Sequence, residues 1–240
     1  MIGTTYICHE NVISRQRESQ LLNLKNAETM ITCSCPAATA LTTIPAVTCA
    51  ENFGQIQKIA FQRLTSSGST KNSFTSTESI TLKASWSTYL TATDGTKVVV
   101  SPYVNNPTSE AGAARTAGGG NESLGGIEEI IGREPTTFTC QLNGAPQAVV
   151  KAMKALQCEA EVGNLGVYLF NEAGQIAAIQ DESTATTYYP IPVRSLFIGD
   201  KAFGGLEAKD TNAISFSMPP NWSDQLAVVT PSDFNPLTDL

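Results

Sequence analysis

The chain has 240 residues, of which 41% are apolar, and its formal net charge is −7. This length and apolar content allow one large β domain or two small ones, and the acidic balance argues against sequence-specific binding to the phosphates of nucleic acid. Charged residues make up only 15% of the chain, below the ~25% typical of soluble domains. That composition suits a subunit covered by copies of itself, or an ordinary β protein rich in Thr and Ser.

The negative charge is concentrated in the last third of the chain. Residues 160–240 carry ten acids and three bases, whereas residues 1–159 carry twelve of each. These acids are either solvated turn residues or the lining of a conduit that lets DNA pass without binding it. The acids that we select as candidates for such a lining are Glu161, Glu172, Asp181, Glu182 and Asp210.

Residues 1–50 predict an N-terminal arm and edge segment. A short helix around 13–24 and a β-prone run at 29–33 precede a loop-like stretch at 35–45. We expect either an arm that becomes ordered against a neighbouring subunit or an edge strand on its own sheet. The first twenty residues lack the apolar segment of a signal peptide, and no run approaches the ~18 apolar residues that span a bilayer.

Residues 51–240 are predicted to form a single β-rich domain. Residues 55–64 alternate apolar and polar side chains with one slip, which indicates a strand with a bulge or a short helix. Residues 65–77 form a Ser/Thr-rich loop, and residues 97–103 are a strand. The stretch 80–90 is ambiguous between helix and strand.

Residues 104–126 are predicted to be a long Gly-rich loop. They contain six glycines and one proline, residues that weaken helices and central strands. The triple glycine lacks the GK[ST] ending of a phosphate-binding loop. We expect the segment to fold against the next subunit of an assembly. The residues assigned to this inter-subunit contact are Asn106, Pro107, Glu110, Arg115, Gly118, Gly119 and Gly120.

Residues 135–180 predict a strand, a helix and two further strands. Apolar residues recur at helical spacing from Val149 to Leu156, which predicts one packed amphipathic helix over about 145–157. The apolar run 166–170 indicates a buried strand, and 175–180 returns beside it after a turn. We expect this helix to be the only one after the first thirty residues.

The remaining strands are predicted at 193–198, 213–218 and 226–230, with a long turn over 199–210. The fold class that follows is mainly β: a β-sandwich or barrel with one packed helix and long loops.

The sequence offers little for catalysis or for metal binding. The one histidine is His9, and there is no G-x-S-x-G or H-E-x-x-H motif. A pair of distant carboxylates for glycoside cleavage stays open. The cysteines are expected to be reduced and mostly buried, and the spacing of 33, 35 and 49 matches no common zinc pattern. We therefore expect no enzyme, no metal and no cofactor. The six cysteines are Cys8, Cys33, Cys35, Cys49, Cys140 and Cys158.

A set of ordered stretches carries a resemblance to known proteins: ENFGQIQKIAFQRL, ATDGTKVVVSPYV, GAARTAGGGNESLGGIEEIIGREPTTFT, GDKAFGGLEAKD and NWSDQLAVVTPSDFNPLTDL. Over roughly residues 33–240, the chain resembles structural virion proteins encoded by tailed phages and prophages of gut Bacteroidetes. In size and layout it looks most like a major tail tube protein.

The resemblance implies a β-sandwich or β-barrel subunit with a helix at its side and a long loop. Such subunits form stacked hexameric rings around a DNA channel with an acidic lumen. The partners implied are copies of the chain itself, other phage tail proteins and DNA in non-specific passage, with no membrane. The implied location is the virion tail, with assembly in the host cytoplasm.

Two alternatives stay open. The first is another virion component, such as a head–tail connector, a baseplate protein or a capsid decoration protein. The second is a β-sandwich module that binds host-surface glycans through aromatic side chains exposed on a groove. The aromatic candidates for that groove are Trp86, Tyr188, Tyr189 and Trp222.

Overall fold

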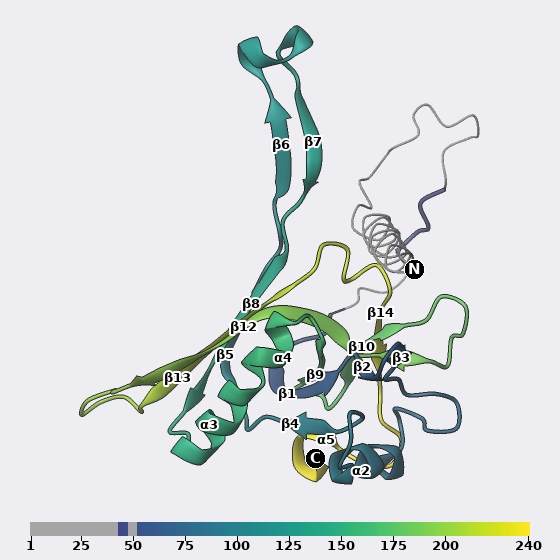
Figure 1. The fold of residues 1–240 in the computed structure, drawn as a ribbon, viewed down its shortest axis with the longest axis vertical. Helices are drawn as coiled ribbons and strands as arrows, with labels where there is room; N and C mark the ends of the chain where they lie inside the picture. Colours follow the sequence, from purple (N-terminus) through teal and green to yellow (C-terminus); the bar gives the residue numbers. More distant parts are fainter. Residues whose placement is uncertain (1–42, 48–51) are drawn as a thin grey trace, which may run out of the picture. The chain divides into compact units, whose positions relative to one another are not determined.

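The computed structural model describes residues 43–47 and 52–240 (Figure 1). These residues divide into two compact units: residues 47 and 52–113 with 133–240, and residues 43–46 with 114–132. The fold is mainly β, as predicted. The helix expected at 13–24 and the β-prone run at 29–33 lie outside the described residues.

The larger unit is built on one antiparallel sheet of ten strands, and β2 and β3 form a separate small hairpin. Four helices accompany the sheet. The strands are β1 (Ile56–Arg63), β2 (Thr65–Ser67), β3 (Thr70–Lys71), β4 (Val98–Val100), β5 (Asn105–Glu110), β8 (Thr136–Asn143), β9 (Leu165–Asn171), β10 (Ile176–Gln180), β11 (Tyr188–Tyr189), β12 (Ile191–Ala202), β13 (Thr211–Met218) and β14 (Leu226–Val229), and the helices are α2 (Lys83–Thr91), α3 (Gln147–Ala155), α4 (Gln157–Glu161) and α5 (Pro236–Asp239).

The sheet curls back on itself. Strand β9 has β1 along one edge and β10 and β12 along the other, and β12 continues the ladder through β13 and β8 to β5. Strand β4 comes just before β5 in the chain and pairs with β1. Between these strands the Ser101 N–H donates to the Ile59 carbonyl at 2.8 Å, and the Val104 N–H to the Gln57 carbonyl at 2.9 Å. The ladder therefore returns to its start and encloses a core, as a barrel does.

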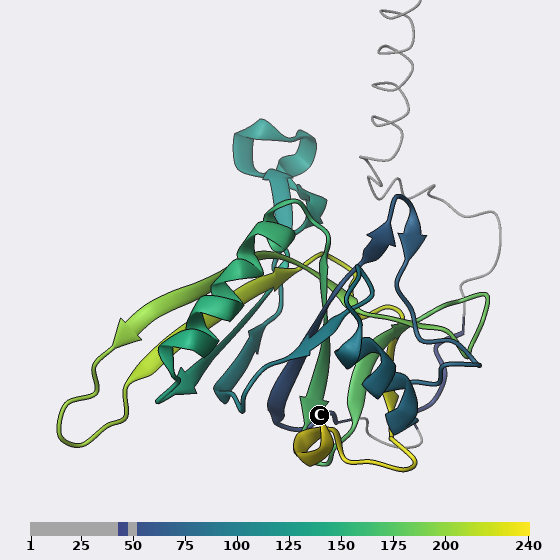
Figure 2. The same ribbon diagram turned by 60° about the horizontal axis from the view of Figure 1, so that its bottom comes forward.

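Two cores lie on the two faces of β9. Leu165, Val167 and Leu169 belong to the inner core, together with residues of β1, β8, β12 and β13. Tyr168 and Phe170 belong to the outer core, because successive side chains of a strand point to opposite faces. Helices α3 and α4 cover the inner core, whereas α2 and α5 cover the outer core (Figure 1, Figure 2).

The structure confirms the predicted helix and most predicted strands. Helix α3 begins after Pro146, buries Val150 and Met153 in the inner core and ends at Ala155. A second short helix, α4, follows Leu156 directly. The strands expected at 166–170, 175–180, 193–198, 213–218 and 226–230 correspond to β9, β10, β12, β13 and β14, and β12 extends to Ala202 into the turn expected from 199.

The expectation of a single helix after residue 30 is wrong, because the ambiguous stretch 80–90 forms α2. This helix has no side-chain N-cap and few apolar residues at helical spacing. It is stabilised by tertiary packing instead. Trp86 is fully buried, its ring lies 4.7 Å from Phe74 and 5.3 Å from Tyr168, and its Nε1 donates to the Ile80 carbonyl at 2.8 Å.

The expectation of an irregular loop over 104–126 is also wrong in part. Residues 105–110 form β5, which pairs with β8. Pro107 is accommodated because the register shifts between Asn105 and Thr108, where Asn106 has a φ of +50°. The strand has no described neighbour on its second edge, and proline is tolerated on such edges.

The smaller unit contains a two-stranded hairpin of β6 (Ala114–Gly118) and β7 (Glu128–Arg133), whose last residue is assigned to the larger unit. Two short 3₁₀ turns, η1 (Gly120–Glu122) and η2 (Leu124–Gly126), join the strands. Five of the six glycines of 104–126 lie in this connection and have positive φ. They therefore form a turn and do not interrupt the strands.

We predict that Trp86→Ala lowers the free energy of unfolding by about 3–5 kcal/mol, because it removes the largest fully buried side chain of the outer core. Chemical denaturation followed by far-UV circular dichroism measures the change. Ser87→Ala, on the exposed side of the same helix, is the control and is expected within about 0.5 kcal/mol of wild type. An equal loss in both variants would contradict the assignment of Trp86 to the core.

Candidate functional site

The β6–β7 hairpin presents an unusual amount of apolar surface. Every residue of β6 is exposed, and in β7 only Gly132 is partly buried. Ile127, Ile130 and Ile131 are 69%, 70% and 61% exposed, and Leu124 is fully exposed. A two-stranded ribbon is marginally stable alone in water, and clustered exposed apolar side chains mark interaction surfaces. The hairpin is therefore the first candidate for a functional surface.

The tip of this hairpin has a defined shape. Ser123 Oγ accepts from the Gly119 N–H at 2.9 Å and donates to the Ile127 carbonyl at 2.7 Å. A Cβ on Gly118, whose φ is +82°, would lie 3.0 Å from Ser123 Cβ. The glycines are required for this turn, because side chains disfavour such backbone angles.

The structure divides the residues predicted for the inter-subunit contact into two groups. Asn106, Pro107 and Glu110 lie on β5 of the larger unit, whereas Arg115 and the three glycines lie in the hairpin. The glycines shape the turn, and the apolar side chains that the hairpin exposes come from the following stretch. The sequence signal for this surface is the run IEEIIG at 127–132, which lies just beyond the predicted loop 104–126.

The five acids predicted to line a conduit do not form one cluster in the fold. Glu172 lies in the β9–β10 turn and Asp181 follows β10, so the two are at opposite ends of that strand. Glu161 ends α4, and Asp210 lies in the β12–β13 connection, where it accepts from the Gly204 N–H at 3.2 Å. Only Asp181 and Glu182 share one place, the loop between β10 and β11.

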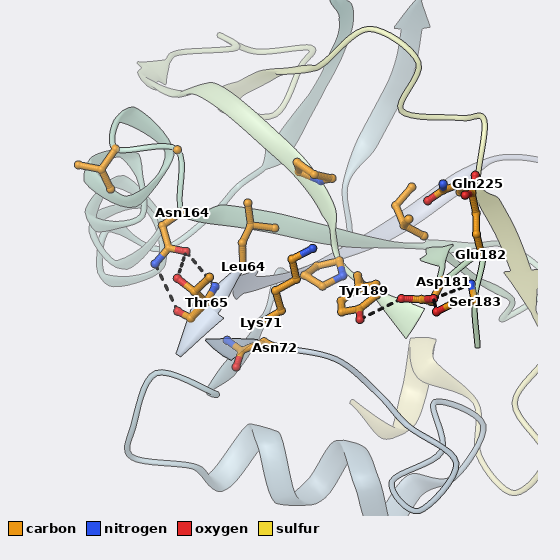
Figure 3. Close-up of a pocket in the computed structure, with 15 residues that line it drawn as sticks. Leu64, Thr65, Lys71, Asn72, Asn164, Asp181, Glu182, Ser183, Tyr189 and Gln225 are labelled. Atoms are coloured by element: carbon orange, nitrogen blue, oxygen red, sulfur yellow. Dashed lines mark hydrogen bonds between the residues drawn. The ribbon is translucent and has the colours of Figure 1, made fainter. Parts of the chain in front are cut away.

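A cleft of about 900 Å³ lies in the larger unit (Figure 3). Its walls come from the β2–β3 hairpin, the turn between α4 and β9, and the β10–β11 loop. On one side, the Tyr189 hydroxyl donates to Asp181 Oδ2 at 3.2 Å, and the Lys71 ammonium lies 5.6 Å from the centroid of the Tyr189 ring. On the other side, Asn164 Oδ1 accepts from the Thr65 N–H and hydroxyl, both at 2.9 Å.

Most polar groups of the cleft hold its own loops together. Asp181 Oδ1 accepts from the Ser183 hydroxyl at 2.5 Å, the Ser183 N–H at 2.8 Å and the Thr184 N–H at 3.1 Å. These bonds, that of the Ser183 hydroxyl first, lower the pKa of the Asp181 carboxyl. Burial, followed by its bond to Asp181, raises the pKa of Tyr189. The lining residues include neither histidine nor cysteine.

The aromatic candidates for a glycan groove do not line one surface. Trp86 is fully buried in the outer core, and Tyr188 packs against the same core. Trp222 packs against the inner core, and its Nε1 donates to Thr136 Oγ1 at 3.1 Å. Tyr189 is the one member of this set that lines the cleft.

In residues 43–47 and 52–240, no three or more His, Cys, Asp or Glu side chains lie close enough to hold a metal ion. None of the helices in the same part of the chain has the length and apolar character to cross a membrane. His9 and Cys8, Cys33, Cys35 and Cys49 lie outside the described residues.

The two described cysteines differ in environment. Cys140 is a free thiol buried in the inner core, as predicted, whereas Cys158 is free and exposed. Cys158 is therefore an exception to the expectation that the cysteines are mostly buried. It lies on the short helix α4, which the sequence did not predict as separate from α3.

No protein-family model matches the chain, and no curated protein sequence is similar to it. Function is therefore inferred from the residues and their geometry.

We predict that iodoacetamide modifies Cys158 in the folded protein and modifies Cys140 only after unfolding. Burial raises the pKa of the Cys140 thiol to about 12, and the thiolate is the reactive form. Peptide mass spectrometry with and without denaturant gives the modified fraction at each position. Rapid labelling of Cys140 at neutral pH without denaturant would mean that the inner core is open.

We predict that the Asp181→Asn variant loses less stability than wild type when the pH is lowered into the acid range. The pKa of the Asp181 carboxyl is lower in the folded state than its ordinary value of ~3.9, so the ionised carboxylate stabilises the fold at pH values above ~3.9. This stabilisation is lost as the pH falls from ~3.9 through the lowered folded-state pKa. Thermal unfolding between pH 6 and pH 2 should show a smaller loss for the variant. Glu182→Gln, its exposed neighbour, is the control, and identical profiles for all three proteins would refute the role of Asp181.

Proposed function

We propose that this protein is a structural subunit that assembles with copies of itself, and that the assembly is the tail tube of a long-tailed phage. The subunits form stacked hexameric rings around a channel for DNA. The observation that carries self-assembly is the apolar hairpin of β6 and β7. The assignment to a tail tube is supported by the resemblance in sequence, and the places of action are the virion tail and, during assembly, the host cytoplasm.

The magnitude of the hairpin's apolar surface is sufficient for one contact of a larger assembly. Ile127, Ile130 and Ile131 are each about two-thirds exposed, so their full burial contributes about 3–6 kcal/mol in total. Association costs on the order of 4–15 kcal/mol in lost freedom of motion. One hairpin contact is therefore weak alone, and it becomes effective where each subunit makes several contacts at once, as in stacked rings.

Open sheet edges supply a second kind of contact. Among the described strands, β14 pairs with β10 alone. Its side chains Leu226 and Val228 are partly exposed. An open edge with apolar side chains is a template for pairing with another chain. In the proposed ring, β14 pairs with a strand of the adjacent subunit.

The charge of the chain supports a channel that does not retain DNA. A net charge of −7 repels the phosphate backbone, and binding to DNA otherwise depends on neutralising it with Lys and Arg. The acids of residues 160–240 are the proposed source of the negative lumen. The partners proposed are copies of the chain, other tail proteins and the passing DNA.

The glycan-binding alternative finds less support. Sugar recognition on a groove requires exposed aromatic faces, and Tyr189 is the one of the four candidates that lines the cleft. The ring of Tyr189 already has the Lys71 ammonium near it, and its hydroxyl is bonded to Asp181. Other virion components that self-assemble would use the same hairpin.

We predict that purified wild-type protein forms tubes or stacked rings in negative-stain electron microscopy. The double variant Ile130→Asp/Ile131→Asp should sediment as single subunits, because it replaces the exposed apolar surface of β7 with charge. Its circular dichroism and melting temperature should match wild type, since both side chains are exposed.

Thr116→Asp is the matched control, because it adds a charge to β6 without removing apolar surface. It should assemble as wild type does. Tubes formed by the double variant would exclude the hairpin as the contact. Wild-type protein that stays monomeric at every concentration and salt condition would contradict the proposed function itself.

A further inference from the structure

We propose that the β6–β7 hairpin of one copy docks in the groove between helix α3 and strand β4 of a second copy. This inference rests on the proposed function and names the receptor surface for the hairpin. Three properties of the groove support this occupant: its apolar lining, the open strand edge beside it and the basic charge around α3.

The groove has a volume of about 330 Å³ and an apolar lining. The one polar side chain in this lining is that of Ser101, and its hydroxyl is already hydrogen-bonded within the chain. The Ser101 hydroxyl accepts from the Ile59 N–H at 3.0 Å and donates to the Pro102 carbonyl at 2.8 Å. The groove therefore favours an apolar occupant. The lining side chains on which the inference depends are Val99 and Val100 of β4 and Ala152, Met153 and Leu156 of α3.

Strand β4 borders this groove and has an open edge. Among the described strands its partner is β1. A strand of another copy that enters the groove can therefore pair with β4, which is the mode of recognition known as β-augmentation. The hairpin supplies a strand of this kind in β7, which carries Ile130 and Ile131.

The charges of the hairpin and of the helix are complementary. Residues 114–133 contain three acids, Glu122, Glu128 and Glu129, and two bases, Arg115 and Arg133, so their net charge is 2 − 3 = −1. Helix α3 contains two lysines and no acid. Complementary charge sets the orientation and the rate of docking more than its affinity.

A second hollow, of about 510 Å³, lies on the other flank of α3, between this helix and β12. It is lined by Lys151 and Lys154 of α3 and by Lys201 of β12, with Asp200 as its one acid. Asp200 forms an ion pair with Lys154, which leaves the surface with an excess of positive charge. In a chain of net charge −7, this basic cluster is a specific feature of the helix that also borders the apolar groove.

The residue pattern of β7 fits both parts of this receptor. Side chains alternate between the faces of a strand, so Glu128 and Ile130 share one face and Glu129 and Ile131 share the other. On either face, the Cα atom of an isoleucine lies about 7 Å from that of a glutamate. An isoleucine in the groove therefore brings an acid close to α3, whose lysines lie on the flank of the helix that faces β12.

The proposed interface is heterologous, because the hairpin and the groove are different surfaces of the chain. Such contacts generate closed rings or open stacks and do not end at a dimer. Each copy both offers a hairpin and receives one, which is the property that a repeating tube requires.

The test is a mixing experiment with two complementary variants. Ala152→Glu places a charged side chain in the groove at an exposed position of α3. Ile130→Asp/Ile131→Asp removes the hairpin's apolar surface. For each variant alone, the fraction of protein that sediments as assemblies in sedimentation velocity should be at least tenfold lower than for wild type. When they are mixed, the groove variant supplies an intact hairpin and the hairpin variant supplies an intact groove, so the two should form mixed complexes that contain both chains.

Ala155→Glu is the matched control, on the same helix but outside the groove lining, and should assemble as wild type does. Ala152→Lys keeps the helix basic and tests the bulk of the side chain alone if Ala152→Glu folds poorly. Normal assembly of both groove variants, while the hairpin variant stays monomeric, would overturn the groove and leave the proposed function intact. Failure of the two variants to combine would also overturn it. If the wild-type protein itself forms no assemblies, the proposed function is refuted instead.

Discussion

The burial of β9 on both faces is the constraint on which the larger unit depends. All seven residues of this strand are buried, and their side chains alternate between the inner and outer cores. Gly166 allows the close approach of Pro190, because a Cβ there would lie 2.7 Å from the proline's Cβ. Tyr168 satisfies its hydroxyl by donating to Gln62 Oε1 at 3.0 Å. A polar substitution at any of these positions would therefore place an unsatisfied polar group in one core or the other, since neither face of β9 is open to water.

The parts of the fold that could be predicted from sequence are those whose pattern is local. The apolar run of β9 and the helical spacing of α3 are visible in the sequence because burial repeats with the period of the element. Helix α2 has no such period. It forms because Trp86 and Tyr89 pack against Phe74 and Tyr168, which come from other segments. Tertiary packing of this kind overrides weak helix propensity, and no local pattern indicates it.

The candidate site was harder to predict than the fold, for two physical reasons. Glycine count alone does not distinguish an irregular loop from a hairpin whose glycines gather in the turn, as Gly118 to Gly120 do. The concentration of acids in residues 160–240 is a property of the sequence, whereas their positions depend on topology. Strand β10 places Glu172 and Asp181 at its opposite ends. The shared negative charge of the five acids was therefore not enough to predict that they line one conduit.

The edges of the sheet bear on which surfaces the proposed assembly would use. Strand β5 is an edge strand, but Pro107 lacks an N–H, Asn106 disturbs the register and Glu110 adds charge. These features protect an edge against unwanted pairing, so Asn106, Pro107 and Glu110 fit protection better than the contact we first assigned to them. Strands β4 and β14 carry valines without proline or charge. An assembly that pairs through β4 and β14 and leaves β5 aside has a defined direction of growth, which a subunit with every edge open would lack.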